Sequence, residues 1–548
     1  MCGMSSLPSQ LAARIEAVAG IDPELRAATK PQFGHYQSNV ALRLAKSEGK
    51  PPREIAQRIV AEVDLSDLCE TPEVAGPGFI NFRLRNDVLA GTATQILEDP
   101  RSGVTSTEHP QTVVIDYSSP NVAKQMHVGH LRTTIIGDCF NRVLSAVGNM
   151  VIPQNHIGDW GTQFGMLIEE ILDEGIDAST LTLDESDALY KRAAARFRED
   201  PEFATRARAR VVVFQGGDEE SLEIWRQLID TSKAGFNEAY DRLNVLLTDA
   251  DLAGESTYND DLPVVVRELE ESGVAVIDNG ALCVFVEGFS APLIIRKSDG
   301  GYGYATTDLA AIRRRVRDLH ADRIIYVTDA RQAGHFAQVF AVARKAGYLP
   351  DNVQAEHVGY GMVLGTDGKP FKTRDGSAAS LSSLLDAAEE EASPAVALAA
   401  IKYADLSNGL QKDYVFDANR MVQTTGDTGP YLQYAHARCC QVLRNAEAID
   451  DAHVGPITVL AEPAEQTLAL TLSRFGEVVA NLAADLQPHK LCTYLFELAT
   501  AYSTFYEQCP VLKSEGAVRD SRLGLCAATR NVLRTGLNLL GIEAPERM

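Results

Sequence analysis

No uninterrupted apolar run in the 548-residue sequence approaches the ~18 residues that a membrane-spanning helix needs. The first residues, Met1-Cys2-Gly3-Met4, lack a basic segment followed by an apolar one, so the sequence predicts no secretory signal. Nine cysteines occur without a C-x-x-C pair, which is typical of reduced and mostly buried thiols. We therefore expect a cytoplasmic protein that does not contact a membrane.

The sequence also lacks an excess of positive charge, because its formal net charge is −24. Such an acidic protein is not expected to coat nucleic acid non-specifically, although a local basic groove is compatible with this charge. The hydrophobic fraction of 45% is sufficient for full-sized cores. At about 150 residues per domain, the length predicts three or four domains.

Three common site motifs are absent: the G-x-x-x-x-G-K-[ST] loop, the dinucleotide fingerprint and H-E-x-x-H. The sequence instead contains His127-Val128-Gly129-His130, between a strand-like run at 113–117 and a helix-like run at 131–147. As metal ligands, the two histidines would need further partners. As phosphate donors at a helix N-terminus they fit better. These four residues alone leave both interpretations open.

Alternating strand and helix patterns around this motif predict a parallel sheet with helices on both faces. The pattern is interrupted around 173–260 by a charged helical insertion, in which most charges of 190–210 are expected to be solvated. Strands resume at 281–287, 293–296 and 323–328. The predicted domains are 1–105, a small α+β unit; 106–393, an α/β unit with the insertion; and 394–548, a helical bundle with long helices at 468–484, 492–506 and 522–540.

Several candidate residues have both a structural and a functional interpretation. The loop from Gly365 to Gly376 holds three basic residues and three glycines, so it is either a solvated hairpin or a cationic phosphate loop. Asp308, near a predicted helix start, could cap the helix or bind a ligand. Phe79 could belong to a core or face a partner. Tyrosines of the bundle could be core residues or could stack on unpaired bases.

The longer motifs resemble those of the arginyl-tRNA synthetases, a family of class I aminoacyl-tRNA synthetases. The resemblance covers essentially the whole chain. It rests on the strand, H-x-G-H and helix followed by an insertion, and on the segments 118–124 (Ser-Ser-Pro-Asn-Val-Ala-Lys), 155–163, 365–374, 429–435 (Gly-Pro-Tyr-Leu-Gln-Tyr-Ala) and 541–548.

This resemblance implies a Rossmann-like catalytic domain, a preceding N-terminal domain and an anticodon-binding bundle. The implied activity joins L-arginine and ATP into arginyl-adenylate and pyrophosphate, and then transfers arginine to the 3′-terminal adenosine of its tRNA. ATP would enter as a complex with Mg²⁺, and no tightly bound protein metal site is implied. The expected partners are the tRNA for arginine, L-arginine and ATP, and the expected oligomeric state is a monomer.

The resemblance also assigns residues to roles. Catalysis is assigned to Lys124, His127, His130 and Lys372. ATP binding is assigned to these four residues together with Gly129, Met362, Val363 and Lys369. Arginine binding is assigned to Asp116, Ser118, Asn121, His127, Tyr304, Asp308 and Gln332. Contact with the tRNA is assigned to Phe79 and Asn81 near the D-loop and to Tyr431, Tyr434, Tyr506 and Met548 near the anticodon.

One motif departs from the class I pattern. A K-M-S-K-S loop usually supplies a second lysine that steadies pyrophosphate, whereas this chain has Lys369-Pro370-Phe371-Lys372-Thr373-Arg374. Some family members share this loss, and a lysine just before the histidine motif is thought to compensate. Lys124 fits that role. The sequence leaves open which of Lys124, Lys369 and Lys372 meets the phosphate.

Two other functions compete with the ligase. A small-molecule nucleotidyltransferase could use the same H-x-G-H fold, but it would not need the two additional domains. A non-catalytic tRNA-binding protein could retain all three domains, but the intact histidine pair and Asp308 argue against it.

Exchange of labelled pyrophosphate into ATP distinguishes the three functions. We expect exchange with arginine only when tRNA is present, since the resemblance implies that arginine activation requires tRNA. The assay is run with each amino acid, with and without tRNA. Exchange driven by another amino acid, or none under any condition, would contradict the ligase prediction.

Overall fold

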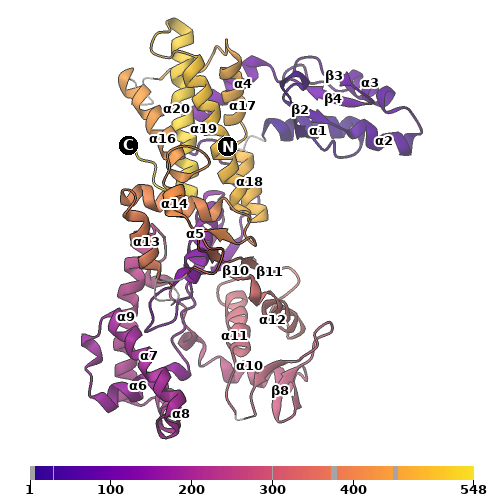
Figure 1. Cartoon of the computed structure of the whole chain (residues 1–548). Helices are drawn as coiled ribbons and strands as arrows, with labels where there is room; N and C mark the ends of the chain where they lie inside the picture. The colour runs from indigo at the N-terminus through magenta and orange to yellow at the C-terminus, as the bar shows by residue number, and fades with distance from the viewer. Residues whose placement is uncertain (1–5, 29, 299, 372–378, 448–453) are drawn as a thin grey trace.

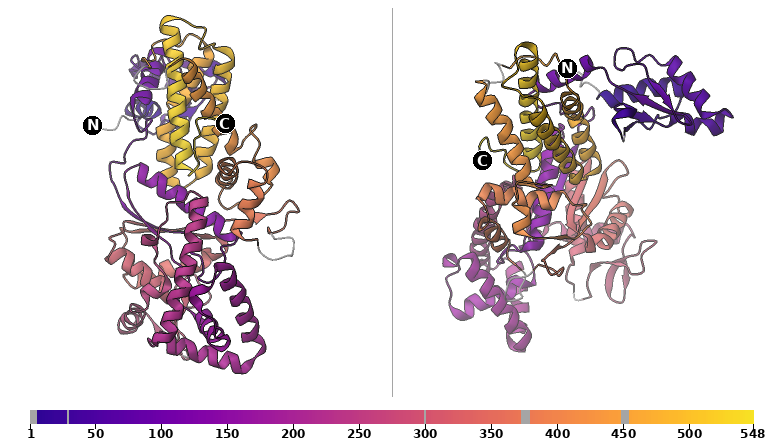
Figure 2. Two further views of the ribbon diagram at one scale, coloured as in Figure 1. Left: turned by 90° about the vertical axis from the view of Figure 1, so that its left-hand side faces the viewer. Right: turned by 45° about the horizontal axis from the view of Figure 1, so that its top comes forward.

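The computed structural model describes residues 6–28, 30–298, 300–371, 379–447 and 454–548. A helical bundle and a parallel sheet with its helices are stacked along one axis, and a small N-terminal domain projects sideways from the bundle (Figures 1 and 2). Within the described residues, no helix is long and apolar enough to cross a membrane. The eight cysteines of this part of the chain are all free and buried.

The N-terminal domain is a four-stranded antiparallel sheet covered by helices. Its sheet has the order β1-β2-β4-β3, so β2 and β4 are the inner strands. Strand β4 is the strand that the pattern from Phe79 to Leu84 predicted. The elements are α1 (Leu7–Ala19), β1 (Arg26–Ala27), β2 (Tyr36–Ser38), α2 (Val40–Glu48), α3 (Pro52–Glu62), β3 (Glu73–Ala75) and β4 (Phe79–Phe82). The next helix, α4 (Asn86–Glu98), packs against the helical bundle and so connects the N-terminal domain to it.

The sheet of the central domain is parallel, with the order β11-β10-β5-β6. Its strands are β5 (Thr112–Asp116), β6 (Met150–Gln154), β10 (Arg323–Asp329) and β11 (Gln354–Tyr360). Side chains alternate between its faces, so Val113 and Ile115 join the core around α5 (Val128–Ala146), while Val114 joins the core of α10 (Leu262–Glu271), α11 (Tyr304–Arg317) and α12 (Ala333–Lys345). The predicted α/β fold class is confirmed.

Two predicted strands belong to a different sheet. The strands that the sequence pattern assigned to the continuing parallel sheet at 281–287 and 293–296 are β8 (Ala281–Val284) and β9 (Leu293–Arg296). They form a separate antiparallel sheet in which β8 lies between β9 and β7 (Val276–Asp278). That assignment was wrong because an apolar strand pattern does not specify which strands pair. The distinguishing signal is alternation: Ile294 is 47% exposed between buried Leu293 and Ile295, whereas β10 is buried continuously from Arg323 to Val327.

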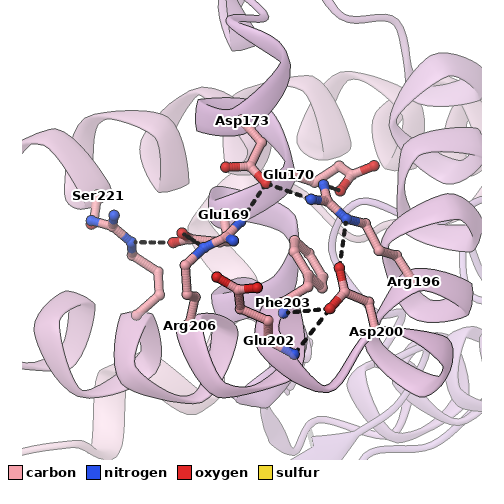
Figure 3. Close-up of polar contacts among 10 residues, drawn as sticks. Glu169, Glu170, Asp173, Arg196, Asp200, Glu202, Phe203, Arg206 and Ser221 are labelled. Atoms are coloured by element: carbon pink, nitrogen blue, oxygen red, sulfur yellow. Dashed lines mark hydrogen bonds and ion pairs between the residues drawn. The ribbon is translucent and has the colours of Figure 1, made fainter.

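The insertion consists of four helices, α6 (Thr162–Glu174), α7 (Leu183–Glu199), α8 (Pro201–Gln215) and α9 (Glu219–Arg242). Arginines of α7 and α8 point toward acidic residues of α6 (Figure 3). The Glu169 carboxylate forms ion pairs with the guanidinium groups of Arg206 at 2.9 Å and Arg210 at 3.0 Å. The guanidinium of Arg196 lies 2.8 Å from the Glu170 carboxylate. Most charges of 190–210 were expected to be solvated; these three arginines are partly exposed and in addition pair with α6.

The C-terminal bundle packs its helices around a largely apolar core. The predicted helix at 468–484 is in fact two helices, and the hydroxyl of Ser473 at the break donates 2.7 Å to the carbonyl of Leu470. The elements are α13 (Leu381–Glu389), α14 (Pro394–Leu406), α15 (Ala418–Met421), α16 (Gly429–Asn445), α17 (Pro463–Leu472), α18 (Phe475–Asp485), α19 (Pro488–Gln508) and α20 (Gly516–Leu539), with a short parallel pair of β12 (Val363–Leu364) and β13 (Tyr414–Val415).

Helix α5 joins the sheet to the bundle through buried charges. Arg132 Nε lies 3.2 Å from Asp405 Oδ2 on α14, and both side chains are at most 1% exposed. The same guanidinium donates to the carbonyls of Gly361 and Lys412 at 2.9 and 3.1 Å. Farther along α5, Asp138 lies 2.7 Å from Arg142 and 3.8 Å from the fully buried ammonium of Lys402.

Removing the carboxylate of Asp405 should destabilise the protein strongly. Asp405→Ala leaves Arg132 buried without its counter-ion, which costs about 3–5 kcal/mol. The midpoint of urea unfolding is the measurement, and Asp351→Ala, at a fully exposed carboxylate 3.8 Å from Arg344, is the matched control. Equal midpoints for the two variants would mean that this buried pair does not hold α5 and α14 together.

Candidate active site

The two motif histidines form the cap at the start of α5. The Nδ1 atom of His127 accepts the backbone N–H of Gly129 at 3.0 Å, and the Nδ1 atom of His130 accepts the backbone N–H of His127 at 3.1 Å. Because both Nδ1 atoms accept, both neutral rings carry their proton on Nε2. The rings stack with their centroids 3.9 Å apart.

Partial removal from water, followed by the charge of Lys124, lowers the pKa of His127 below its usual 6.5, and removal from water and the neighbouring His127 and Lys124 lower the pKa of His130. Both imidazoles are therefore uncharged at neutral pH. Neutral rings still donate through Nε2–H. At Gly129 a Cβ would lie 2.7 Å from the His127 ring, so only glycine permits this stacked cap.

A cavity of about 430 Å³ opens at the carboxyl ends of β5 and β10. Parallel sheets commonly bind ligands at this edge. Of the residues that the resemblance assigned to arginine binding, five line this cavity and so come together: Asp116, Asn121, Tyr304, Asp308 and Gln332. Its other lining residues are Ser119, His156, Gly158, Glu255, Thr307, Tyr326, Thr328, His335 and Phe336.

Two predicted arginine ligands lie outside the lining of this cavity. Ser118 is 1% exposed, and its hydroxyl is 2.7 Å from the hydroxyl of Tyr240 and 3.0 Å from that of Thr134. Ser118 therefore anchors the loop after β5 to α9 and α5. His127 lies at the start of α5 instead.

Three carboxylates of the cavity differ in their partners. Asp116 is paired with the fully buried guanidinium of Arg315 at 2.6 Å, so its charge is balanced within the protein. Asp308 accepts a hydrogen bond from His335 at 2.7 Å. Burial, together with Asp159 and Asp308, raises the pKa of Glu255 to about 7. The cavity is therefore anionic and holds two carboxyl groups, those of Asp308 and Glu255, without an arginine or lysine partner among the described residues.

Glu255 and His335 were missed by sequence reasoning. Glu255 begins a single helical turn, η4 (Glu255–Tyr258), inside a stretch that the sequence characterised only as charged and helical. No local pattern distinguishes it from its neighbours. His335 has a weak signal, because it follows Gln332 by three residues at the start of α12 and so lies on the same face.

The predicted phosphate ligands occupy different surroundings. The ammonium of Lys124 lies 3.9 Å from the ring centroid of Tyr190, on α7 of the insertion. Lys369 is exposed in a turn, where its backbone N–H donates to the Asp367 carboxylate at 3.0 Å. Lys372 lies outside the described residues. On β12 and the residue before it, Val363 is buried and Met362 is 38% exposed.

The predicted tRNA-binding residues form two groups. On the bundle, Tyr434, Tyr506 and Met548 are 40%, 43% and 52% exposed, and Tyr431 is half-buried beside Phe496. The guanidinium of Arg438, which sequence reasoning missed, lies 4.7 Å from the Tyr434 ring and 5.1 Å from the Tyr506 ring.

The second group is on the N-terminal domain. Phe79 is half-buried, and Asn81 is buried with its amide oxygen accepting from Gln37 at 2.7 Å. Asn81 therefore lies beneath the surface, where it holds Gln37.

Comparisons with known proteins agree with this architecture. Residues 92–395 match the family model "tRNA synthetases class I (R), catalytic domain", residues 5–84 match "Arginyl tRNA synthetase N terminal domain" and residues 432–548 match "DALR anticodon binding domain". An arginine–tRNA ligase of Cutibacterium acnes is 68% identical, with 100% of both chains covered. The chain belongs to the arginyl-tRNA synthetase family.

Other members support the same assignment. The arginine–tRNA ligase of Thermobifida fusca is 50% identical over 100% of both chains. Among solved structures, the arginyl-tRNA synthetase of Thermus thermophilus superimposes with a TM-score of 0.83 at 27% identity, covering 99% of this chain and 100% of that one. The predicted function of an arginine–tRNA ligase that uses ATP is confirmed, so neither rival function is supported.

Proposed function

We propose that the cavity binds L-arginine, with Asp308 and Glu255 as the acceptors of its guanidinium group. The observation that carries this proposal is a pair of carboxyl groups that have no lysine or arginine partner within the part of the chain that the structure describes, in a cavity also lined by Tyr304 and Gln332. A guanidinium has five donors in one plane, and carboxylates can accept two of them in parallel. A neutral side chain would leave both groups unsatisfied, which supports selectivity for arginine.

We assign the remaining predicted cavity residues, Asp116 and Asn121, to the other end of the arginine molecule. Asp116, neutralised by Arg315, offers acceptor atoms without adding net negative charge near the substrate's own carboxylate. Asn121 lies beside it, and the Asn121 side chain is packed against Gly158, where a Cβ would lie 2.4 Å from the amide oxygen. Ser118 contributes through the loop that it anchors.

ATP would lie against the start of α5. In the first step the arginine carboxylate attacks the α-phosphorus and pyrophosphate leaves, so catalysis requires alignment and neutralisation of phosphate charge. We assign the Nε2–H groups of His127 and His130 to the phosphates, since both point away from the cap bonds at Nδ1. Gly129, Met362 and Val363 would contact the adenine, and Lys124, Lys369 and Lys372 would supply positive charge.

The tRNA would contact both ends of the molecule. Exposed Tyr434, Tyr506 and Met548, together with Arg438 between the two rings, offer aromatic and cationic surfaces for unpaired anticodon bases. Tyr431 extends this surface along α16. On the N-terminal domain, Phe79 would approach the D-loop, with Asn81 acting through Gln37.

The remaining expectations are part of the same proposal. ATP would act as its Mg²⁺ complex, and the enzyme would be a cytoplasmic monomer with domain limits near 1–105, 106–393 and 394–548. Among the described residues, no group of three or more His, Cys, Asp or Glu side chains is arranged to hold a metal ion.

Loss of the Asp308 charge tests the arginine pocket. Asp308→Asn should raise the KM for arginine about 100-fold, because a charged acceptor of the guanidinium is lost, while the KM for ATP changes little. The control is Asp318→Asn, at the C-terminal end of the same helix, where the carboxylate is 66% exposed. An unchanged KM for arginine in Asp308→Asn would place the guanidinium elsewhere.

A second variant tests the proposed role of Lys124 at the phosphates. Lys124→Ala should lower the rate of arginine activation about 100-fold and weaken tRNA binding much less, because the ammonium would neutralise charge that develops as pyrophosphate leaves. Pre-steady-state exchange and tRNA titrations give the two quantities. Lys191→Ala, at a surface lysine 2.7 Å from Asp187, serves as the control. Activation at the wild-type rate would exclude Lys124 from this role.

A further inference from the structure

His335 and Asp308 form a hydrogen-bonded pair inside the cavity. The Nε2 atom of His335 lies 2.7 Å from Oδ2 of Asp308, and the pair joins the first turn of α12 to the first turns of α11. The side chains are 37% and 18% exposed, and both line the cavity. A ligand can therefore reach the pair.

The protonation state of His335 decides what this pair offers to a ligand. When the ring is neutral with its proton on Nε2, it donates one hydrogen bond to Oδ2 and leaves the full negative charge of Asp308 for the ligand. The bond also restricts rotation of the carboxylate. When the ring is protonated, the same geometry becomes an ion pair, and a cationic ligand must compete with the imidazolium for the carboxylate.

We propose that His335 is a positioning residue for arginine recognition: its neutral ring orients the Asp308 carboxylate toward the guanidinium, and its protonated ring competes with the guanidinium for that carboxylate. This inference rests on the proposed role of Asp308 in the arginine pocket. It makes arginine affinity fall as the solution becomes more acidic, through a group that does not itself bind arginine.

The groups around His335 fix the sign of this dependence. The hydrogen bond to Asp308 raises the pKa of His335 above its usual 6.5, so the ring gains its proton at a higher pH than a free histidine does. Burial, Asp159 and Asp308 raise the pKa of Glu255 to about 7, and protonation of Glu255 also removes an acceptor. Other titratable or charged groups that line the cavity are His156, Tyr304, Tyr326 and Asp116, which is paired with Arg315. On the neighbouring strands lie His357, behind the Phe336 ring, Asp329, which is paired with Arg331, and Glu356, which is paired with Arg323.

Two variants of His335 separate positioning from simple packing. In His335→Gln the amide nitrogen can reach about where Nε2 lies, so the donor is kept and the titration is removed. In His335→Leu both are lost. We would measure the Kd of arginine by calorimetry, on the full-length enzyme with its tRNA, from roughly pH 6 to 8.5. His109→Gln, at an exposed histidine of the linker between the first two domains, is the matched control.

For the wild type we expect the Kd of arginine to rise as the pH falls across this range, because His335 and Glu255 both gain protons. His335→Gln should bind within about threefold of the wild type at pH 8.5, and the limiting slope of log Kd against pH should fall by one unit. His335→Leu should weaken binding about tenfold at pH 8.5, since the orienting bond is lost, and should also lose that unit of slope. The kcat of all variants should change less than the KM for arginine.

Other outcomes overturn the inference in recognisable ways. If His335→Gln keeps the full slope, the titration belongs to Glu255 or another group, and a flat profile in Glu255→Gln would identify it. If His335→Leu binds like the wild type at pH 8.5, the hydrogen bond does not position Asp308. The Asp308→Asn variant distinguishes the two proposals: normal arginine binding in that variant refutes the pocket itself, whereas impaired binding there with unaffected His335 variants refutes only the role of His335.

Discussion

The fold depends on charges that are buried along helix α5. Arg132 and Asp138 are each at most 1% exposed, and each is paired with a residue of α14, Asp405 and Lys402 respectively. A buried ion pair does not necessarily add stability relative to apolar packing, but breaking it leaves an uncompensated charge. These pairs therefore fix the position of the bundle relative to the sheet. A shift of α14 by a few ångströms would separate both pairs at once.

This constraint reaches the active site because the same helix begins with the two histidines. His127 and His130 form the cap of α5, so their rings are fixed to the helix axis that Arg132 anchors two residues farther on. The carbonyl of Gly541, at the C-terminal end of the bundle, accepts from the Lys402 ammonium at 3.0 Å. The end of the bundle is thus connected through the buried Lys402 and Asp138 to α5, the helix whose first turn carries the two histidines.

The sequence predicted what local patterns encode and missed what the tertiary fold assembles. Periodicity located β5, α5 and β10, and motif resemblance brought Asp116, Asn121 and Asp308 into one site. Residues 281–296 were assigned to the wrong sheet because strand propensity does not specify a partner. Glu255 and His335 come from segments about 80 residues apart in sequence and carry no local signature, so only the packing of η4 and α12 around the cavity reveals them.

Charge balance in the cavity connects these observations. Asp116 has its counter-ion in the protein, whereas Asp308 and Glu255 have no arginine or lysine partner among the described residues. Burial, with smaller contributions from the negative charges of Asp159 and Asp308, raises the pKa of Glu255 to about 7. A bound guanidinium would offset the repulsion between these carboxylates and return the Glu255 proton to solution. Under this proposal, selectivity for arginine and sensitivity to acid have one physical cause, which is that Asp308 and Glu255, among the residues that the structure describes, receive an arginine or lysine-like cation only from the substrate.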